Sequence, residues 1–274
     1  MSTSNDLQTE YLNCPLCEGE IIFLGYADII NHPIWHEGLP KKLEWMECQR
    51  CGHIHTRGYW TPTGLDEVFR KTQANQITGG DNNPPDSKRA QWLPVVKNAI
   101  RHSGGYAALF DEDKYWCDIG CGNGALLMTA RDFGFSAFGL DTRKETVERI
   151  QALGFQANQA DFMQAQFDRP LQIISMMDVL EHLPFPRQVL QKAHDSLAPA
   201  GLLIISLPDA SCSTWKIMDH EKNNPYWMEI EHHHNFSRNL LMQLLIQQGF
   251  DIVDFDIPNR YKAQMEIYAK KRTI

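Results

Sequence analysis

From residue 115 onward the sequence alternates between two kinds of segment, and this alternation limits its possible folds more than any other feature. Short apolar runs typical of buried strands are separated by stretches whose apolar residues recur at helical spacing. Such an alternation predicts an α/β fold with a doubly wound, mostly parallel sheet. The predicted strands span 115–120, 136–141, 155–161, 171–180, 202–208, 251–257 and 264–271, and the predicted helices span 123–134, 143–154, 185–201 and 237–250.

The first part of the chain has a different character. Its first 62 residues contain four cysteines and two strand-like runs, at 20–29 and 42–48. The next 50 residues show helical spacing on both sides of a Gly/Asn/Pro-rich loop at 77–87, which is either a linker or a lid. We therefore expect three parts, namely a small cysteine-rich ribbon at 1–62, a helical linker or cap at 63–112 and the α/β domain at 113–274.

The overall charge of the chain is acidic, with a formal net charge of −8 over 274 residues. An acidic chain repels phosphate backbones, so a nucleic acid is an unfavourable partner. No run of about 18 apolar residues occurs, which predicts no membrane span, and the N-terminus lacks an apolar signal core. The odd number of cysteines, seven, argues against a disulfide framework. Together these features favour a cytoplasmic location.

The sequence D-I-G-C-G-N-G at 118–124 ends a predicted strand and begins a predicted helix. Its three glycines allow a tight turn, the close approach of a ligand and close packing of helix on strand. At the end of the next strand, Asp141 can accept hydrogen bonds from ribose hydroxyls. Asp118, two residues before the first glycine, can hold a cation such as an amino group. The loop therefore favours a cationic amino-acid nucleoside over a diphosphate, which dinucleotide sites place at a helix N-terminus.

Five motifs, taken in chain order, resemble those of class I S-adenosylmethionine-dependent methyltransferases of the type 11/23 kind. They are W-C-D-I-G-C-G-N-G at 116–124, G-L-D at 139–141, A-D-F at 160–162, D-V-L-E-H-L-P-F-P at 178–186 and L-A-P-A-G-L-L-I-I-S-L-P at 197–208. Several motifs in order are far more specific than a lone glycine loop. The resemblance implies a seven-stranded, Rossmann-like sheet whose last strand is antiparallel; an NAD-type Rossmann domain is the alternative.

The resemblance also implies which residues hold the cofactor, S-adenosylmethionine. By position they are Asp118, Gly120, Gly122 and Gly124 for the methionine part, Asp141 for the ribose, Asp161 for the adenine amino group, Phe162 for the adenine face and Asp178 for the cofactor edge. Because the sulfonium methyl group is already electrophilic, such a site mainly has to align a nucleophile and exclude water. A general base is needed only where the acceptor must lose a proton.

The motif D-V-L-E-H-L places three polar residues after a predicted strand, at the edge where doubly wound sheets bind ligands. Asp178, Glu181 and His182 have a spacing that suits Mg²⁺, and His182 can instead act as a base. A similar segment of ubiquinone-type O-methyltransferases is implicated in metal and membrane association. The alternative, which we favour, is that these side chains hydrogen-bond to the loop backbone and to the edge of the cofactor.

Residues 208–237 match no regular element and are rich in aromatic, Asn and His residues, which predicts a substrate cap. Their last part, E-I-E-H-H-H-N-F-S, resembles the segment before the last long helix of small-molecule methyltransferases, including sugar C-methyltransferases. There a histidine lies over the substrate. The match points to Glu231 and His232 as catalytic candidates, followed by His182. This chain lacks the Tyr and the further His that precede the pair in the sugar enzymes, and a solvated polar turn is the alternative.

The four N-terminal cysteines form two C-x₂-C pairs that lie 30 residues apart, Cys14 with Cys17 and Cys48 with Cys51. Each pair suits a knuckle turn that points two thiolates at one tetrahedral ion, which predicts a structural Zn²⁺ site with a closed ligand shell. A thioredoxin-like redox pair needs only one such pair beside a βαβ unit. His53 and His55 are then expected to lie around the site or on the surface rather than on the ion.

Four aromatic residues are further candidates for contact with a substrate. Either Tyr59 or Trp60, which follow the second knuckle, is expected to reach it. Tyr226 and Trp227 in the predicted cap either pack on the substrate or belong to the core.

These observations lead to one favoured function and two alternatives. We expect S-adenosylmethionine-dependent methylation of a small molecule, with a zinc ribbon that covers one side of the site. The first alternative is a ribosomal RNA methyltransferase whose zinc finger reads the RNA. The second is a non-catalytic protein that binds S-adenosylmethionine or acts as an adaptor; the intact glycine loop argues against it.

Overall fold

The computed structural model describes residues 7–70, 85–111, 114–258, 260 and 262–273. Most of the predicted loop at 77–87 lies outside these residues. The described strands form sheets of seven, four and two strands. Their bounds are β1 Gln8–Glu10, β2 Ile21–Asp28, β3 Lys42–Cys48, β4 Ile54–Thr56, β5 Gly58–Trp60, β6 Tyr115–Ile119, β7 Ser136–Asp141, β8 Gln156–Gln159, β9 Leu171–Met177, β10 Leu197–Pro208, β11 His234–Asn235, β12 Phe250–Asp256 and β13 Gln264–Lys271.

The large sheet has the strand order β12-β13-β10-β9-β6-β7-β8. Its strands β6 to β10 run parallel, whereas β13 is antiparallel to both β10 and β12. The predicted fold is therefore confirmed, including the number of strands and the antiparallel last strand. In such a sheet, ligands bind at the carboxyl ends of the strands, where the chain turns into the helices.

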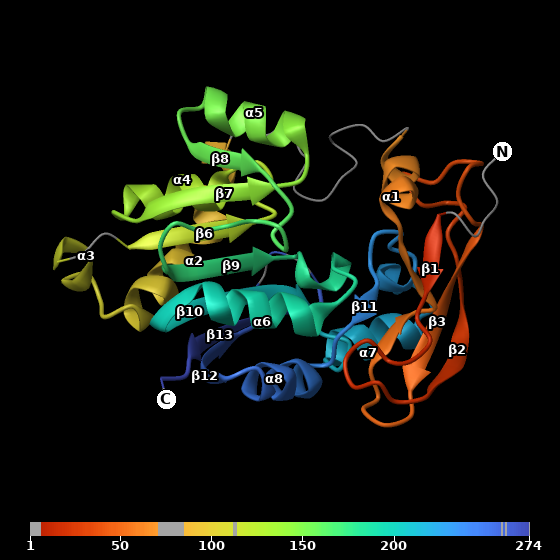
Figure 1. The fold of residues 1–274 in the computed structure, drawn as a ribbon. Helices are drawn as coiled ribbons and strands as arrows, with labels where there is room; N and C mark the ends of the chain where they lie inside the picture. The colour runs from red at the N-terminus through yellow and green to blue at the C-terminus, as the bar shows by residue number, and fades with distance from the viewer. Residues whose placement is uncertain (1–6, 71–84, 112–113, 259, 261, 274) are drawn as a thin grey trace.

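Helices cover both faces of the large sheet (Figure 1). β10 shows why, because its successive apolar side chains point to opposite sides: Leu203 and Ile205 pack with α6 and α8, whereas Leu202 and Ile204 pack with α2, α4 and α5. None of the helices in the described ranges is long and apolar enough to span a bilayer. The helices are α1 Pro62–Phe69, α2 Arg89–His102, α3 Ala108–Asp111, α4 Ala125–Asp132, α5 Lys144–Ala152, α6 Pro186–Ser196, α7 Ser213–His220 and α8 Arg238–Gln247, with 3₁₀ turns η3 Pro85–Lys88, η4 Leu180–His182 and η5 Pro225–Trp227.

Two predicted boundaries were wrong. The helix expected over 185–201 ends at Ser196, and the following residues already belong to β10, because Pro199 lacks the N–H that a helix needs. The segment 208–237 does contain regular elements, namely α7, η5 and β11. The side chain of Cys212 caps α7 by accepting a hydrogen bond from the Trp215 N–H, a thiol cap that standard capping residues do not signal.

The N-terminal cysteine-rich part forms a small sheet of its own, in the order β11-β4-β3-β2. Its strands β2 and β3 match the two predicted runs. The fourth strand, β11, comes from the predicted cap, and His234 pairs with His55 across the ladder. Figure 1 shows this module, in red and orange, beside β11 and α7 in blue. The cap segment is thus held from both sides, by the large sheet and by the N-terminal module.

Candidate functional site

The glycine loop between β6 and α4 has the backbone that its sequence predicts. Gly120, Gly122 and Gly124 have φ angles of +66°, +54° and +81°, a region that favours glycine. A Cβ atom on Gly120 would lie 2.6 Å from Cγ2 of Val179. The Gly120 N–H donates to the Leu140 carbonyl over 2.8 Å, which fixes the loop against β7. The loop therefore packs closely against β7 and against Val179 after β9.

Asp118, at the end of β6, is buried beneath this loop. Its carboxylate accepts a hydrogen bond from the Ser175 hydroxyl on the neighbouring strand β9. Burial raises the pKa of Asp118 to about 7, and repulsion from Asp141 adds to the rise. A cation placed beside the carboxyl would favour its ionised form, so this position suits the ammonium group of an amino acid.

Asp141 ends β7 with its carboxylate directed at the glycine loop. Oδ2 accepts a hydrogen bond from the Gly122 N–H over 3.3 Å. Arg143 binds the same carboxylate with two N–H groups, each at 2.9 Å. The sequence prediction missed Arg143; an arginine two residues after a strand-ending acid is the signal that would have found it. A ribose on Asp141 would share the carboxylate with this guanidinium.

The two residues predicted for adenine follow β8 and face different environments. Asp161 is exposed, and its Oδ1 accepts a hydrogen bond from the Met163 N–H over 2.9 Å. Phe162 is buried, with its ring centroid 6.3 Å from that of Phe167. The carboxylate of Asp161 is thus exposed to solvent, whereas the ring of Phe162 belongs to the hydrophobic core.

Asp178 follows β9 and has a φ of +58°, a strained value for a residue with a side chain. Its carboxylate accepts a hydrogen bond from the Gln264 side chain on β13. Burial raises the pKa of Asp178 to about 7, although the charge of Arg260 opposes the rise. The strained backbone lies at the carboxyl edge of the sheet, where such strain is typical of ligand sites.

Glu181 and His182 of η4 come together with His232, which lies far from them in the sequence. One ligand atom from each lies within 4.8 Å of the others. The rings of His182 and His232 meet edge to face, with centroids 4.7 Å apart. Asp178, which the sequence suggested as a metal ligand with Glu181 and His182, is not in this group. The cap, rather than the motif itself, supplies the third member.

Burial shifts the pKa values of Glu181 and His232 in opposite directions. Glu181 is buried, and neither of its carboxylate oxygens has a hydrogen-bond partner within the described part of the chain. Burial raises the pKa of Glu181 well above its ordinary value, and Asp178 adds repulsion. Burial, followed by repulsion from His182, holds the pKa of His232 well below its ordinary value. Near pH 7, His232 is therefore a neutral imidazole, the form in which it can accept a proton.

The segment around Glu231 is not the solvated turn that was the alternative interpretation. His232, His233 and His234 are all buried. The His233 N–H donates to the Glu181 carbonyl over 2.9 Å, and the His233 carbonyl accepts from the Thr56 N–H over 2.9 Å. Burial raises the pKa of Glu231, and the His182 ring lies against its backbone, with Nδ1 at 3.1 Å from the Glu231 carbonyl.

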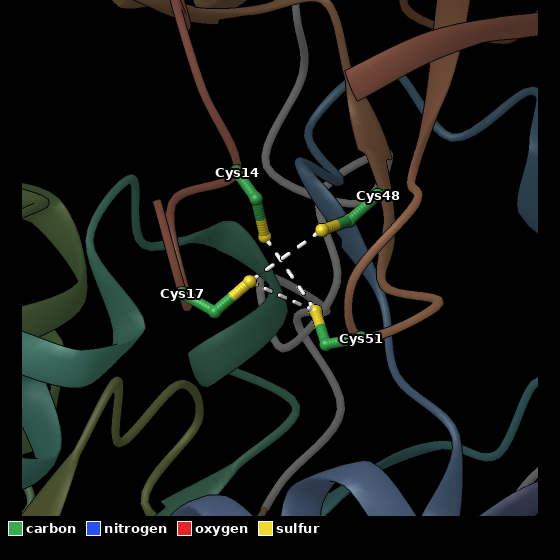
Figure 2. Close-up of side chains that lie close together, drawn as sticks. All are labelled: Cys14, Cys17, Cys48 and Cys51. Carbon is green, nitrogen blue, oxygen red and sulfur yellow. Dashed lines mark hydrogen bonds between the residues drawn. The ribbon is translucent and has the colours of Figure 1, made fainter. Parts of the chain in front are cut away.

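Four thiols of the N-terminal module converge on one point, as Figure 2 shows. The Sγ atoms of Cys17 and Cys48 lie 3.5 Å apart, those of Cys17 and Cys51 3.5 Å, and those of Cys14 and Cys51 3.7 Å. These distances are too long for disulfides. A tetrahedral Zn²⁺ with bonds of about 2.3 Å to sulfur requires sulfur atoms roughly 3.8 Å apart, so the four thiols fit that ion.

The neighbouring histidines lie between the module and the cap. The expectation that they might lie on the surface was wrong, because His53 and His55 are both buried. Nε2 of His53 lies 3.1 Å from Nδ1 of His234, and the two rings are stacked. Neither ring belongs to the four-sulfur group. They connect the cysteine knuckle to β11.

The N-terminal module holds the backbone of the cap at several points. The indole N–H of Trp60 donates to the Ile230 carbonyl over 2.7 Å, directly before Glu231. The indole N–H of Trp45 donates to the Trp227 carbonyl over 3.0 Å. Trp60 is buried, so its clearest contact is with the segment that carries the catalytic candidates. The module therefore fixes the backbone of the cap at Trp227 and Ile230.

The remaining aromatic candidates pack on other side chains. Tyr59 lies with its ring 5.1 Å from that of Phe185, at the start of α6. Tyr226 stacks on Trp215 at 5.1 Å, and Trp227 meets the same indole edge to face at 5.7 Å. The ring of Tyr226 also lies 6.4 Å from that of His232. The cap thus has its own small aromatic core next to the histidine.

Among proteins with assigned functions, ubiquinone biosynthesis O-methyltransferases are similar to part of this chain. That of Shewanella sp. (strain ANA-3) is 30% identical over 97 residues, which is 32% of this chain and 41% of that protein. That of Cronobacter sakazakii is 30% identical over 106 residues, or 36% of this chain and 44% of that protein. The chain thus spans about two fifths of the length of these curated relatives.

Solved structures share the fold at low sequence identity. A magnesium protoporphyrin IX methyltransferase from Synechocystis PCC 6803, solved with bound SAM, is 16% identical with a TM-score of 0.55, over 77% of this chain and 96% of that one. A putative S-adenosylmethionine-dependent methyltransferase from Listeria monocytogenes is 14% identical with a TM-score of 0.52, over 67% and 99% of the two chains. These similarities concern the fold.

The family model described as "Methyltransferase domain" matches residues 96–254, more than half of the chain. The match begins within α2, in the part that the sequence suggested was a linker or cap, and runs through the cap to β12. With the strand order of the large sheet and the glycine loop at its carboxyl edge, this match shows that the chain belongs to the methyltransferase-domain family.

Proposed function

We propose that the chain transfers the methyl group of S-adenosylmethionine to a small-molecule acceptor. The observation that carries this proposal is the pair of buried acids, Asp118 and Asp141, on either side of a glycine loop whose three glycines all have positive φ angles. One acid suits an ammonium group, and the other suits the hydroxyls of a ribose. A diphosphate would instead be repelled by both.

The cofactor residues follow from this arrangement. Asp118 and the loop glycines would hold the methionine part, Asp141 the ribose, and Asp161 with Phe162 the adenine. Asp178 would border the cofactor from the loop after β9. S-adenosylmethionine, when bound, supplies an electrophilic methyl group. The residues of the chain bind it, orient the acceptor and exclude water.

The cap would supply the acceptor side of the site. His232 is buried, neutral and adjacent to His182, so it is our first candidate for the base that removes a proton from the acceptor. Glu231, which directly precedes His232 in the cap, would contact the acceptor. A site built from buried side chains beneath a packed cap suits a small molecule, as do the names of the ubiquinone relatives.

The N-terminal module would bind one structural Zn²⁺ through Cys14, Cys17, Cys48 and Cys51. Four sulfur ligands close a tetrahedral shell and leave no position for a substrate. The role of this ion would be to hold the knuckles together, so that Trp45 and Trp60 can support the cap.

A methyl-transfer assay with fractionated extract tests the proposed function. The protein is incubated with tritiated S-adenosylmethionine and either the small-molecule fraction or the RNA fraction of a cell extract. We expect label in the small-molecule fraction. Label that appears only in the RNA fraction and disappears after ribonuclease treatment would refute the small-molecule proposal in favour of an RNA acceptor.

The affinity for S-adenosylhomocysteine is expected to fall as the pH drops below 7. The pKa of Asp118 in the ligand-free protein is about 7, and binding of an ammonium group requires the ionised form. Below pH 7 a proton must therefore leave before the ligand binds, which weakens binding by up to about tenfold per pH unit. Calorimetry at pH 8 and pH 6 measures this change. Asp118→Asn, which cannot ionise, should bind weakly at both values; an equal pH dependence in the variant would exclude Asp118 as the cause.

A further inference from the structure

We propose that Glu181 is the positioning residue for His232, holding one ring N–H of this histidine so that the other ring nitrogen faces the acceptor. This inference rests on the proposed function, in which His232 is the base. It assigns a role to Glu181, a buried acid that is not among the proposed cofactor-binding residues.

The two side chains face each other with unmet hydrogen-bonding capacity. Both oxygens of Glu181 and Nδ1 of His232 are buried, and none of the three has a partner among the described residues. One ligand atom of each lies within 4.8 Å of the other. A buried carboxylate and a buried imidazole without partners are costly unless they meet. Hydrogen bonds of catalytic groups are often long before substrate binds.

The backbone keeps the pair side by side. The His233 N–H donates to the Glu181 carbonyl over 2.9 Å, which ties the turn η4 to the cap. On the other flank, Nδ1 of His182 lies against the Glu231 carbonyl at 3.1 Å. That contact occupies one nitrogen of His182, whereas the partner of Nδ1 on His232 remains to be supplied. Glu181, which offers a carboxylate oxygen within 4.8 Å of a ring nitrogen of His232, can supply it.

The groups around the pair make the charged form of each side chain unfavourable alone, but the two charged forms together are favourable. Asp178 opposes ionisation of Glu181, and three histidines oppose a charge on His232. A carboxylate next to an imidazolium offsets both costs. The titratable groups that face the pair are Asp178 and His182 after β9, Tyr226, Glu231 and His233 in the cap, and His32 in the N-terminal module.

The proton step is balanced within these residues. The acceptor–H bond breaks, and its proton goes to the free ring nitrogen of neutral His232. The other ring nitrogen keeps its proton and donates a hydrogen bond to the Glu181 carboxylate. The electron pair of the acceptor forms the new bond to the methyl group, and the pair of the broken carbon–sulfur bond stays on sulfur. Glu181 thus fixes the tautomer and stabilises the imidazolium, as the third member of a base-orienting set does elsewhere.

Nitrogen-15 NMR of the imidazole rings tests the pair without knowledge of the acceptor. Full-length, zinc-loaded protein saturated with S-adenosylhomocysteine is compared with Glu181→Gln, and the His232 signals are assigned by their loss in His232→Gln. In the wild type we expect one fixed tautomer. In Glu181→Gln we expect a tautomer mixture and a His232 pKa lower by about one to three pH units. Glu181→Asp, which keeps the charge, should restore most of both effects.

Two controls separate positioning from folding. Glu221→Gln alters an exposed acid at the end of α7 and should leave the His232 signals unchanged. Unchanged tautomer and pKa in Glu181→Gln would overturn the proposal. So would a Mn²⁺ titration that broadens His182 and His232 in the wild type but not in Glu181→Gln, because the three groups would then hold a cation rather than a shared proton. If S-adenosylhomocysteine does not bind, the proposed function is refuted. The same comparison of wild type and Glu181→Gln in ligand-free protein still tests whether Glu181 positions His232.

Discussion

Gly120→Ala is expected to weaken the binding of S-adenosylhomocysteine by at least about 100-fold, or roughly 3 kcal/mol. Two effects add. A φ of +66° costs a residue with a Cβ about 1–2 kcal/mol. The new methyl group would also lie 2.6 Å from Cγ2 of Val179 and would push the loop that carries Asp178 and Glu181. Isothermal titration calorimetry measures the loss, and thermal unfolding checks that the variant folds.

Gly25→Ala is the matched control for this change. It makes the same substitution within β2, where a Cβ meets no atom within 4 Å and the backbone is not in the left-handed region. Its affinity for S-adenosylhomocysteine should equal that of the wild type. If Gly120→Ala also bound normally, the glycine loop would not be the cofactor site, and the proposed function would lose its main support.

Cys48→Ser is expected to remove the zinc and, with it, the methylation of the acceptor, while leaving cofactor binding intact. Structural zinc sites of this kind contribute about 10 kcal/mol or more to folding. Without the ion, the knuckles would separate and Trp45 and Trp60 would release the cap. The glycine loop lies on the large sheet, outside this module. We expect about one zinc per chain in the wild type, far less in the variant, and at least about 100-fold slower methyl transfer.

Cys212→Ser provides the comparison for this variant. Cys212 is a free thiol outside the cluster, and serine keeps an acceptor for the Trp215 N–H. Zinc content, measured by plasma mass spectrometry, and methyl transfer should stay at wild-type levels. Full zinc content in Cys48→Ser would exclude Cys48 as a ligand, and undiminished methyl transfer without zinc would exclude a role of the module in the acceptor site.

The large sheet was predictable because its information is local. The central strands of the sheet are apolar runs of suitable length, and the glycine loop marks one strand–helix junction within a few residues. The same holds for the two C-x₂-C pairs, whose knuckle spacing is visible in the sequence. The helix over 185–201 was predicted too long because no glycine interrupts the segment before Gly201, whereas the helix ends at Ser196, ahead of Pro199.

The histidine arrangement was not predictable from the sequence. A run of three histidines suggests a polar turn, and only tertiary packing decides that His232 to His234 are buried. The meeting of Glu181 with His232, and of His53 with His234, joins residues far apart in the chain. Arg143 was not predicted for a different reason. Its pairing with Asp141 is local, but an arginine at the start of a helix is common on protein surfaces.

The ladder between β4 and β11 has a consequence for how the protein forms. All four cysteines precede β11 in the chain, so they are synthesised before His234 and Asn235, which cover the open edge of β4. Until then the nascent module presents an unpaired strand edge, a template for association with other chains. Contacts of such long sequence separation form slowly. Early metal binding would hold the two cysteine knuckles together during this interval, but only the synthesis of β11 would cover the edge of β4.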